Sequence, residues 1–475
     1  MKPHPPATTP DRSPAALPAT CAVAGLAVRA AVRSRLFLSL MVLLLAVVIG
    51  VPLAVKGDGT AAGQVRILLL YALGMGSMVL GAATVWAGCG MISQEIEERQ
   101  IRLLAVKPVH PFRIWLGKWL GLLALDAVLL GAAGAVVYGL LQWRLGAAQI
   151  SPEERRQIGE EILTGRRLFS PRPDPIAAQV DAELARLIRA HGLPAGISRE
   201  EARATLERAL RTRRAAVAPG RTREWIFDVP SPAGETTPVL LRFRLSPDAA
   251  GRRPVSGTWT AGPVGEPERF RHAVEGVLTG AVQFRIPPEL LGTGEPVVVR
   301  FHNEPRPRSR TVVFRAGHEA ELLVREASFA ANLVLALVIV FCQLALLAAI
   351  GITAGAAFSF PVAAFTAAAL LLISLLSHSF IGGSSPEAAA RVHAHHHGPA
   401  PEPSALVQTA EKGIRCTAAI TEPAMQFAPL GRLADGILVA PARAARAAVL
   451  LLFLYPAPLA LIATLCLRRR ELGAT

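Results

Sequence analysis

Asp126 is the residue whose type and position could do chemistry most directly, because it lies about two turns inside the apolar run Trp119–Leu141. An unpaired charge at the centre of a bilayer costs at least about 2.5–3.5 kcal/mol. We therefore expect Asp126 to face a helix interface, a cavity or water, and we name it a candidate intramembrane polar site. Gln343 and His378 could be its partner, although no spacing ties either residue to it. A proton or cation site and a purely structural carboxyl remain equally open.

A histidine cluster, His393 and His395–His397, could bind Zn²⁺ or Cu²⁺. It lacks carboxylate or Cys ligands at helical spacing, so we interpret it as a solvated loop and assign no metal ligands. The sequence contains no phosphate-cradling Gly-x-x-x-x-Gly-Lys-Ser/Thr loop, no nucleophile elbow, no His-Glu-x-x-His and no Cys-x-x-Cys. We therefore predict that the chain is not an enzyme, that it has no catalytic residues, and that it binds no cofactor of its own.

The composition indicates a membrane protein rather than a soluble one. The 475 residues are 52% hydrophobic and the mean hydropathy is +0.40, which is more apolar than an ordinary soluble domain. The apolar residues gather in runs that approach the roughly 20 residues of a membrane-spanning helix. Six runs predict spans: Phe37–Val55, Ile67–Gly88, Trp119–Leu141, Phe329–Ile350, Phe358–Phe380 and Val449–Leu467. We predict an α-helical polytopic membrane protein with six transmembrane helices and an inserted extracytoplasmic α+β domain.

Basic residues beside these runs predict the side of the membrane that each segment faces. They precede the first run, fill the hairpin between the second and third, and follow the last run. By the positive-inside rule these segments and both termini are cytoplasmic, in a multi-pass protein of the bacterial inner (plasma) membrane. The net charge of +15 then meets the anionic headgroups of the lipid bilayer, so no nucleic acid is predicted as a partner. Residues 1–20 are predicted to be a disordered, Pro-rich cytoplasmic tail.

The polar segment 144–328 is large enough to fold alone, and the predicted topology puts it outside the cytoplasm. Ile176 and Val180 begin a helix-spaced apolar pattern, and Ser198 with Glu201 is typical of a capping box that opens a second helix. Short alternating runs bounded by Pro or Gly then predict strands over Trp225–Phe227, Val239–Phe243, Val282–Ile286, Val297–Phe301 and Thr311–Phe314. The pattern indicates a helical hairpin followed by a β-sandwich.

The other boundaries follow from the same spans. Residues 21–143 hold spans one to three, residues 329–381 hold spans four and five, and residues 449–475 hold span six and a basic cytoplasmic tail. Residues 382–448 form a second extracytoplasmic loop, and its apolar part, Phe427–Leu438, is predicted to re-enter or to lie on the membrane surface.

Two patterns of small residues predict further details of the spans. Gly131, Ala135 and Gly139 form a small-xxx-small face that predicts close helix packing on the third span. The stretch Gly351–Gly355 predicts a very short turn between spans four and five.

The most informative segment is 92–118, between the second and third spans. Ile92 and Ile96 share an apolar side with later residues while acidic and basic residues face water, which predicts an amphipathic helix at the cytoplasmic surface. Lys107-Pro108 ends this helix, because a residue before Pro is pushed out of the α region. Lys118 opens the third span and is expected to extend to the headgroups.

This segment resembles the cytoplasmic segment of ABC type-2 exporter permeases, in which an acidic helix, a Leu-Leu pair, a Lys-Pro-Val turn and a Gly-Lys recur. The family often has Gly-Thr where Arg99-Gln100 stand and Arg where Pro111 stands. The resemblance extends to the span number and the Arg-Arg-Arg-Glu tail, but not to the segment 144–328. The positions that match are Glu95, Glu98, Leu103, Leu104, Lys107, Pro108, Val109, Gly117 and Lys118.

The resemblance implies a membrane-spanning permease subunit of an ATP-driven exporter. Segment 92–118 would couple it to a separate ABC ATPase subunit, which would bind the ATP and Mg²⁺. A second permease copy or a paralogue would complete a dimer, and the external domain could bind a periplasmic partner. Two alternatives stay open. One is a membrane-anchored extracytoplasmic sensor or scaffold, and the other is an ion-driven secondary transporter that uses Asp126.

Overall fold

The computed structural model divides into two compact units. The helical unit comprises Met1–Leu163, Phe329–Asp435 and Val439–Thr475, and the sheet unit comprises Thr164–Ser328 and Gly436–Leu438. The structure describes residues 16–33, 35–55, 61–97, 110–146, 151–173, 175–192, 198–230, 239–246, 254–278, 281–291, 295–306, 310–315, 317–383 and 427–472.

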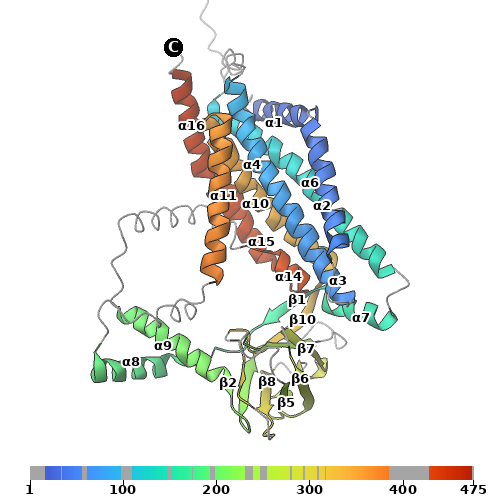
Figure 1. Cartoon of the computed structure of the whole chain (residues 1–475), viewed down its shortest axis with the longest axis vertical. Coiled ribbons are helices and arrows are strands. Elements are labelled where there is room, and N and C mark those ends of the chain that lie inside the picture. The colour runs from blue at the N-terminus through green and yellow to red at the C-terminus, as the bar shows by residue number, and fades with distance from the viewer. Residues whose placement is uncertain are drawn as a thin grey trace, which may run out of the picture. The chain divides into compact units, whose positions relative to one another are not determined.

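Long apolar helices make up most of the helical unit (Figure 1). The central helix α10 contacts α4, α6, α11 and α16 and carries the largest share of the buried apolar side chains. The elements are α1 (Ala16–Arg33), α2 (Arg35–Ala54), α3 (Ala61–Ile67), η1 (Leu68–Ala72), α4 (Leu73–Glu97), α6 (Pro111–Gly146), α7 (Pro152–Glu161), α10 (Phe329–Ala357), α11 (Phe360–Gly383), α14 (Leu430–Ala434), α15 (Pro441–Ala448), η3 (Val449–Leu454) and α16 (Pro456–Leu472).

Four continuous helices within the described residues are long and apolar enough to cross a membrane. They are Gly63–Glu97, Pro111–Gly146, Phe329–Ala357 and Pro441–Arg469. A fifth could be the pair Thr20–Arg33 and Phe37–Pro52, which is bent by 69°. Helix α11 has a shorter apolar stretch, Phe360–Leu370, among its described side chains. The part of the chain that the structure describes therefore contains four or five helices that could span a membrane, and six spans remain a prediction.

Several predicted boundaries are corrected by the helices. Helix α1 begins at Ala16, so the last residues of the predicted tail 1–20 are helical; their Ala-rich sequence favours a helix, and Thr20 is buried against α6. The stretch Gly351–Gly355 lies inside α10 rather than in a turn, because its glycines pack against α4. The predicted packing face at Gly131 and Gly139 is uncovered among the described residues, since no atom outside the local helix backbone lies within 4 Å of a Cβ at either position.

The inserted domain is also shorter than the predicted segment 144–328. Helix α7 belongs to the helical unit, where Ile158 and Ile162 join its apolar core. The sheet unit begins with β1 (Thr164–Phe169), which the sequence analysis did not predict. The sheet unit also includes Gly436–Leu438, the end of the stretch Phe427–Leu438 that was predicted to re-enter or to lie on the membrane surface. Two hydrogen bonds join these residues to β1. The Arg166 N–H donates to the Gly436 carbonyl (3.0 Å), and the Leu438 N–H donates to the Arg166 carbonyl (2.8 Å).

The sheet unit is built on two four-stranded antiparallel sheets with orders β1-β10-β4-β7 and β3-β8-β5-β6, together with a two-stranded ribbon, β2-β9. Both sheets contribute apolar side chains to one core, in which Trp225, Phe243 and Trp259 meet. The other strands are β2 (Ala216–Val217), β3 (Thr222–Phe227), β4 (Val239–Arg244), β5 (Pro254–Pro263), β6 (Phe270–Val277), β7 (Ala281–Ile286), β8 (Val297–Asn303), β9 (Val312–Val313) and β10 (Glu321–Ser328), with a 3₁₀ turn η2 (Pro288–Leu291).

Two helices complete the sheet unit, as the sequence predicts. Helix α8 (Ala177–His191) carries the helix-spaced apolar residues, and Gly192 ends it with a φ of 72°. Helix α9 (Arg199–Arg214) begins at the predicted capping box, in which Ser198 and Glu201 satisfy each other's backbone N–H groups.

Candidate functional site

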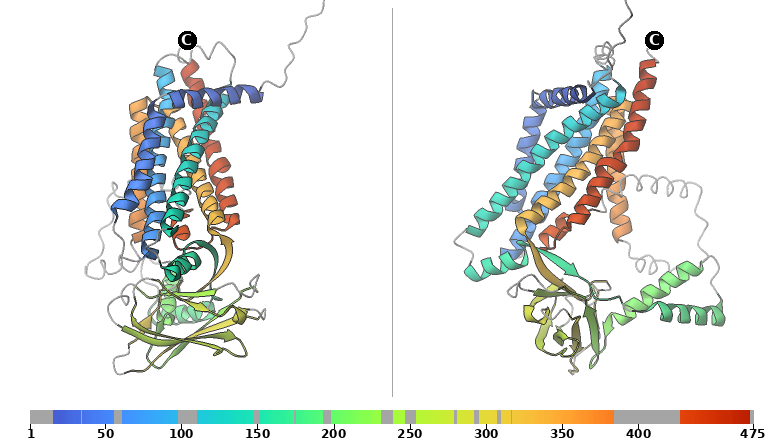
Figure 2. Two further views of the ribbon diagram at one scale, coloured as in Figure 1. Left: turned by 90° about the vertical axis from the view of Figure 1, so that its right-hand side faces the viewer. Right: turned by 180° about the vertical axis from the view of Figure 1, so that it is seen from behind.

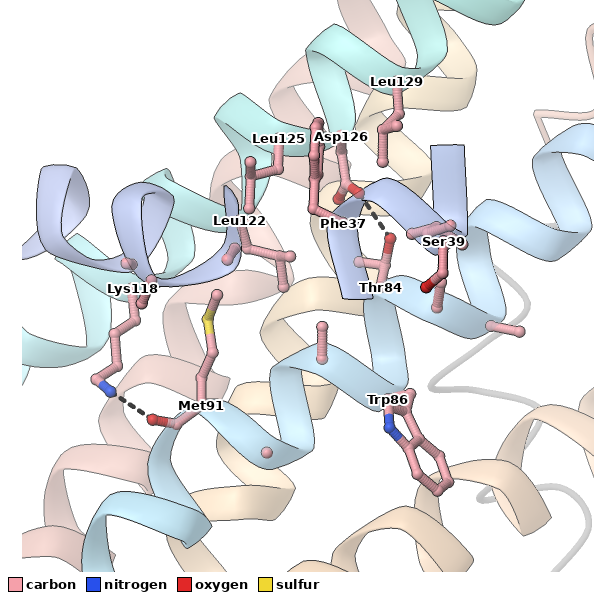
Figure 3. Close-up of a pocket in the computed structure, with 18 of the residues that line it drawn as sticks. Phe37, Ser39, Thr84, Trp86, Met91, Lys118, Leu122, Leu125, Asp126 and Leu129 are labelled. Carbon is pink, nitrogen blue, oxygen red and sulfur yellow. Dashed lines mark hydrogen bonds between the residues drawn. The ribbon is translucent and has the colours of Figure 1, made fainter. Parts of the chain in front are cut away.

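The helical unit contains a pocket of about 830 Å³ between α1, α2, α4 and α6 (Figure 3). Small residues on α1 and α4 make room for this pocket, because side chains such as those of Ala27 and Ala83 are only methyl groups. Most of the lining is apolar, and the only ionisable side chains among its described residues are Glu95, Lys118 and Asp126. The lining residues are Ala27, Ala30, Ala31, Phe37, Ser39, Leu40, Leu43, Val79, Ala82, Ala83, Thr84, Trp86, Ala87, Gly90, Met91, Gln94, Glu95, Lys118, Leu122, Leu125, Asp126, Leu129 and Phe360.

Asp126 lies on the pocket wall and is only 2% exposed. Its Oδ1 lies 2.8 Å from the Thr84 Oγ1, on the neighbouring helix α4 (Figure 3). Its Oδ2 is buried and has no hydrogen-bond partner among the described residues. The expectation that Asp126 faces a helix interface or a cavity is therefore confirmed.

The partner that the structure describes for Asp126 is Thr84, which sequence analysis did not name. Its only signal in the sequence is a hydroxyl inside the apolar run Ile67–Gly88. Gln343 lies on α10 and is absent from the pocket lining. The side chain of His378 lies outside the described residues.

Lys118 and Glu95 form an ion pair between α6 and α4, with the Lys118 Nζ 2.6 Å from the Glu95 Oε2. The Lys118 Nζ also donates to the Met91 carbonyl, and its side chain is only 6% exposed. The expectation that Lys118 extends to the headgroups is therefore wrong. A nearby carboxylate and carbonyl on α4 satisfy its ammonium group inside the protein, which removes the reason to extend.

Gly117, beside this lysine, positions helix α1. A Cβ at Gly117 would lie 2.7 Å from the Val23 Cβ and 3.0 Å from the Thr20 carbonyl oxygen, and one at Gly121 would lie 2.8 Å from the Ala27 Cβ. Contacts this close need glycine, so α1 packs directly onto the α6 backbone. This packing brings Ala27, and with it the α1 wall of the pocket, against α6.

The predicted coupling segment is described at its two ends. Ile92 and Ile96 lie on the last turns of α4 and pack with Trp115 and Trp119 of α6. Up to Glu97 this part of the segment therefore continues the long helix α4 and is not a separate surface helix. Two matching positions, Glu95 and Lys118, form an ion pair between α4 and α6, whereas Gly117 packs against α1. The other six, Glu98, Leu103, Leu104, Lys107, Pro108 and Val109, lie outside the described residues.

Basic side chains gather at this same end of the helical unit. The end of α4, the start of α6, helix α1 and the C-terminal end of α16 all lie there (Figure 2). The His110 Nε2 lies 2.6 Å from the Arg468 Nη2, which joins the start of α6 to α16. The described basic residues of these elements are Arg29, Arg33, Arg113, Lys118, Arg468 and Arg469.

The remaining candidate sites are elsewhere in the chain. The described residues contain no group of three or more His, Cys, Asp or Glu side chains that could hold a metal ion, and His393 and His395–His397 lie outside them. Comparison with protein-family models, with curated proteins and with solved structures finds no match for this chain. Function must therefore be argued from the apolar helices, the basic end and the pocket.

Proposed function

We propose that this chain is the membrane-spanning permease subunit of an ATP-driven exporter of the ABC type, driven by a separate ATPase that docks on segment 92–118. In this proposal the chain crosses a bacterial inner membrane six times, both termini are cytoplasmic, and a second permease copy or a paralogue completes the pathway. The support comes from the helical unit and from the resemblance of segment 92–118 to that family.

The observation that carries the proposal is the ion pair between Glu95 and Lys118. The Lys118 Nζ lies 2.6 Å from the Glu95 Oε2, so the pair joins the last turn of α4 to the N-terminal part of α6. The two residues lie near the two ends of segment 92–118, which would bind the ATPase. A docking segment can transmit force to the spans only if it is tied to them firmly. Because Lys118 is nearly buried, this link is screened less by water than a surface pair would be.

The basic end of the helical unit supports the topology. Arg29 and Arg33 on α1, Arg113 on α6, and Arg468 on α16 come from three parts of the chain that are far apart in sequence, yet they lie at one end. The positive-inside rule assigns such an end to the cytoplasm. That is also the compartment in which a docking ATPase and its ATP would be found.

The experiment is a co-purification of the tagged chain from its native membranes into lipid nanodiscs, with identification of any P-loop ATPase that it retains and measurement of ATP hydrolysis. We expect the two to co-purify and hydrolysis to rise when the permease is present. The double variant Glu98→Lys, Lys107→Glu should lose co-purification by at least about tenfold, because it reverses two charges of the docking segment. A charge reversal outside that segment, Glu153→Lys on α7, should bind the ATPase like the wild type.

Two results would overturn the proposal. One is that the wild-type chain recovers no ATPase under mild solubilisation. The other is that the docking variant, eluting as the wild type does in size-exclusion chromatography, still binds and stimulates the ATPase. The first result would favour a membrane-anchored sensor or scaffold whose working part is the sheet unit. The second would mean that the ATPase docks outside segment 92–118.

A further inference from the structure

The pocket of the helical unit is mostly apolar, and one of its few ionisable groups, the Asp126 carboxyl, lacks a full set of partners among the described residues. Glu95 and Lys118, its other ionisable groups, neutralise each other in an ion pair. The lining residues from α1 and α2 carry no ionisable group. Asp126 itself lines the pocket, and its Oδ2 is a buried hydrogen-bond acceptor without a partner among the described residues.

The hydrogen bonds at Thr84 indicate which protonation form of Asp126 satisfies both of them. The Thr84 Oγ1 lies 2.8 Å from the Asp126 Oδ1 and also 2.8 Å from the Leu80 carbonyl oxygen. A hydroxyl has one proton and can donate to only one of these acceptors at a time. Both bonds form together if the Asp126 carboxyl is neutral, since its Oδ1–H then donates to Thr84 while Thr84 donates to Leu80.

An ionised Asp126 would need a cation, because a buried charge is stable only when it is paired. The nearest basic lining residue, Lys118, lies two turns away along α6, about 12 Å at the rise of a helix. It is already bound to Glu95 and to the Met91 carbonyl. The charge that would balance Asp126 must therefore come with a ligand.

We propose that this pocket binds a lipophilic amine in its ammonium form, with the Asp126 carboxylate as counter-ion. The ammonium N–H donates to the Asp126 Oδ2, and the hydrocarbon body packs on Phe37, Leu122, Leu125 and Leu129 (Figure 3). The volume of about 830 Å³ suits a drug-sized ligand. An ammonium ion from water displaces the carboxyl proton, so binding releases one proton and the complex is electrically neutral.

This ligand class would be the cargo of the proposed exporter, and that role rests on the proposed function. Binding itself does not, because it needs only this chain. A binding measurement without any ATPase therefore separates the two proposals. Loss of ATPase coupling would leave the pocket proposal standing, and loss of amine binding would leave the coupling proposal standing.

The test is equilibrium binding of radiolabelled 1-naphthylmethylamine to the full chain in nanodiscs, with empty nanodiscs as the blank for partition into lipid. The neutral analogue 1-naphthylmethanol has nearly the same size and lacks the charge. We expect the wild type to bind the amine about 10- to 100-fold more tightly than the alcohol, the range of a charged hydrogen bond. Amine affinity should also rise by up to about tenfold per pH unit while Asp126 is neutral.

Two variants separate charge from shape. Asp126→Asn keeps a group that can donate to Thr84, so the fold is preserved, and it should bind amine and alcohol equally weakly. Ala83→Phe fills the pocket and should weaken both ligands, whereas Ala127→Phe, on an exposed face of α6 outside the lining, should weaken neither. Equal binding of amine and alcohol by the wild type would overturn the proposal, as would wild-type amine affinity in Asp126→Asn.

Discussion

The Nζ of Lys118 lies 2.6 Å from the Oε2 of Glu95, and the two side chains differ sharply in exposure, at 6% for Lys118 and 34% for Glu95. Water can therefore hydrate the Glu95 carboxylate in part, whereas the Lys118 ammonium needs the ion pair to compensate for its burial. Loss of Glu95 leaves a buried cation whose remaining partner among the described residues is the Met91 carbonyl, whereas loss of Lys118 leaves a carboxylate that water still reaches.

We predict that this asymmetry appears in a double-mutant cycle. Glu95→Gln should destabilise the helical unit by about 1–3 kcal/mol, less than for a fully buried pair because Glu95 is partly hydrated. Lys118→Met should cost less, and the double variant should recover part of the loss because no charge is left buried. Thermal unfolding in detergent, followed by tryptophan fluorescence, measures all three. A double variant less stable than both single ones would contradict this explanation.

Close packing of α4 on α10 gives a second prediction. A Cβ at Gly355 would lie 2.3 Å from the Cys89 carbonyl oxygen, and one at Gly351 would lie 2.7 Å from the Val85 carbonyl oxygen. Backbone atoms cannot move aside, so Gly355→Ala should separate the helices and lower stability by about 1–3 kcal/mol. Gly131→Ala, at a site with no atom within 4 Å, should leave the midpoint of thermal unfolding unchanged or slightly higher. Equal effects of the two substitutions would refute this role of Gly355.

These glycines illustrate what the sequence could not reveal. The pattern Gly131-Ala135-Gly139 has the spacing of a packing face, yet it is exposed, while Gly351 and Gly355 pack tightly although they suggest a turn. Spacing identifies a face that permits close approach, but the partner helix decides which face is used. Helix α4, the partner here, is more than 250 residues away in sequence, and no local pattern identifies it.

The sheet unit shows the same limit. Strands β3, β4, β7 and β8 were predictable because their apolar residues are continuous or alternate between turn residues. Strand β5 was missed because Gly257 and Gly262 interrupt its pattern, and Gly257 is needed because the Phe301 ring lies against it. Strand β10 was missed because charged residues such as Glu321 resemble a loop.

The pocket was predictable only at Asp126, whose charge is conspicuous in an apolar run. Thr84 is 42 residues away along the chain and has no such signal. The pairing of Glu95 with Lys118 likewise depends on how α4 and α6 meet, although both residues were singled out separately. In each case the residue type pointed to a role, but the sequence did not show which residue it would contact.

Contact between α1 and α6 gives a third prediction. Gly121→Leu should displace α1, because a Cβ there would already lie 2.8 Å from the Ala27 Cβ and 3.0 Å from the Ala24 carbonyl oxygen. Trypsin should then cleave after Arg29 and Arg33 at least about fivefold faster, since a released helix unfolds locally more often. Mass spectrometry of the released peptides measures the rate. Gly139→Leu, on an uncovered face of the same helix, is the control and should match the wild type.

The last prediction concerns the buried pair of Arg242 and Glu321 in the sheet unit. The Arg242 Nη2 lies 2.6 Å from the Glu321 Oε2, and the His318 Nδ1 lies 2.6 Å from the Glu321 Oε1. Burial alone raises the pKa of Glu321, but the Arg242 charge and the hydrogen bonds from His318 and Arg242 outweigh it and lower the pKa below the ordinary value for glutamate.

The sign of the pH dependence follows from this lowered pKa. Because the folded-state pKa lies below the unfolded-state value of about 4.3, the carboxylate stabilises the sheet unit fully above that value, and this stability is lost as the pH falls through the folded-state pKa. We expect β10 of the full chain to lose hydrogen-exchange protection at lower urea concentration at about pH 3 than at about pH 7, after correction for intrinsic exchange rates.

Glu321→Gln should flatten this dependence and cost about 3–5 kcal/mol at neutral pH, because it leaves Arg242 buried without its counter-ion. Glu224→Gln is the matched control. Its partner Arg300 is 35% exposed and Glu224 itself is 41% exposed, so the substitution should cost at most about 1 kcal/mol and leave the acid dependence intact. If Glu321→Gln kept the acid dependence of the wild type, another carboxylate of the sheet unit would have to be responsible for it.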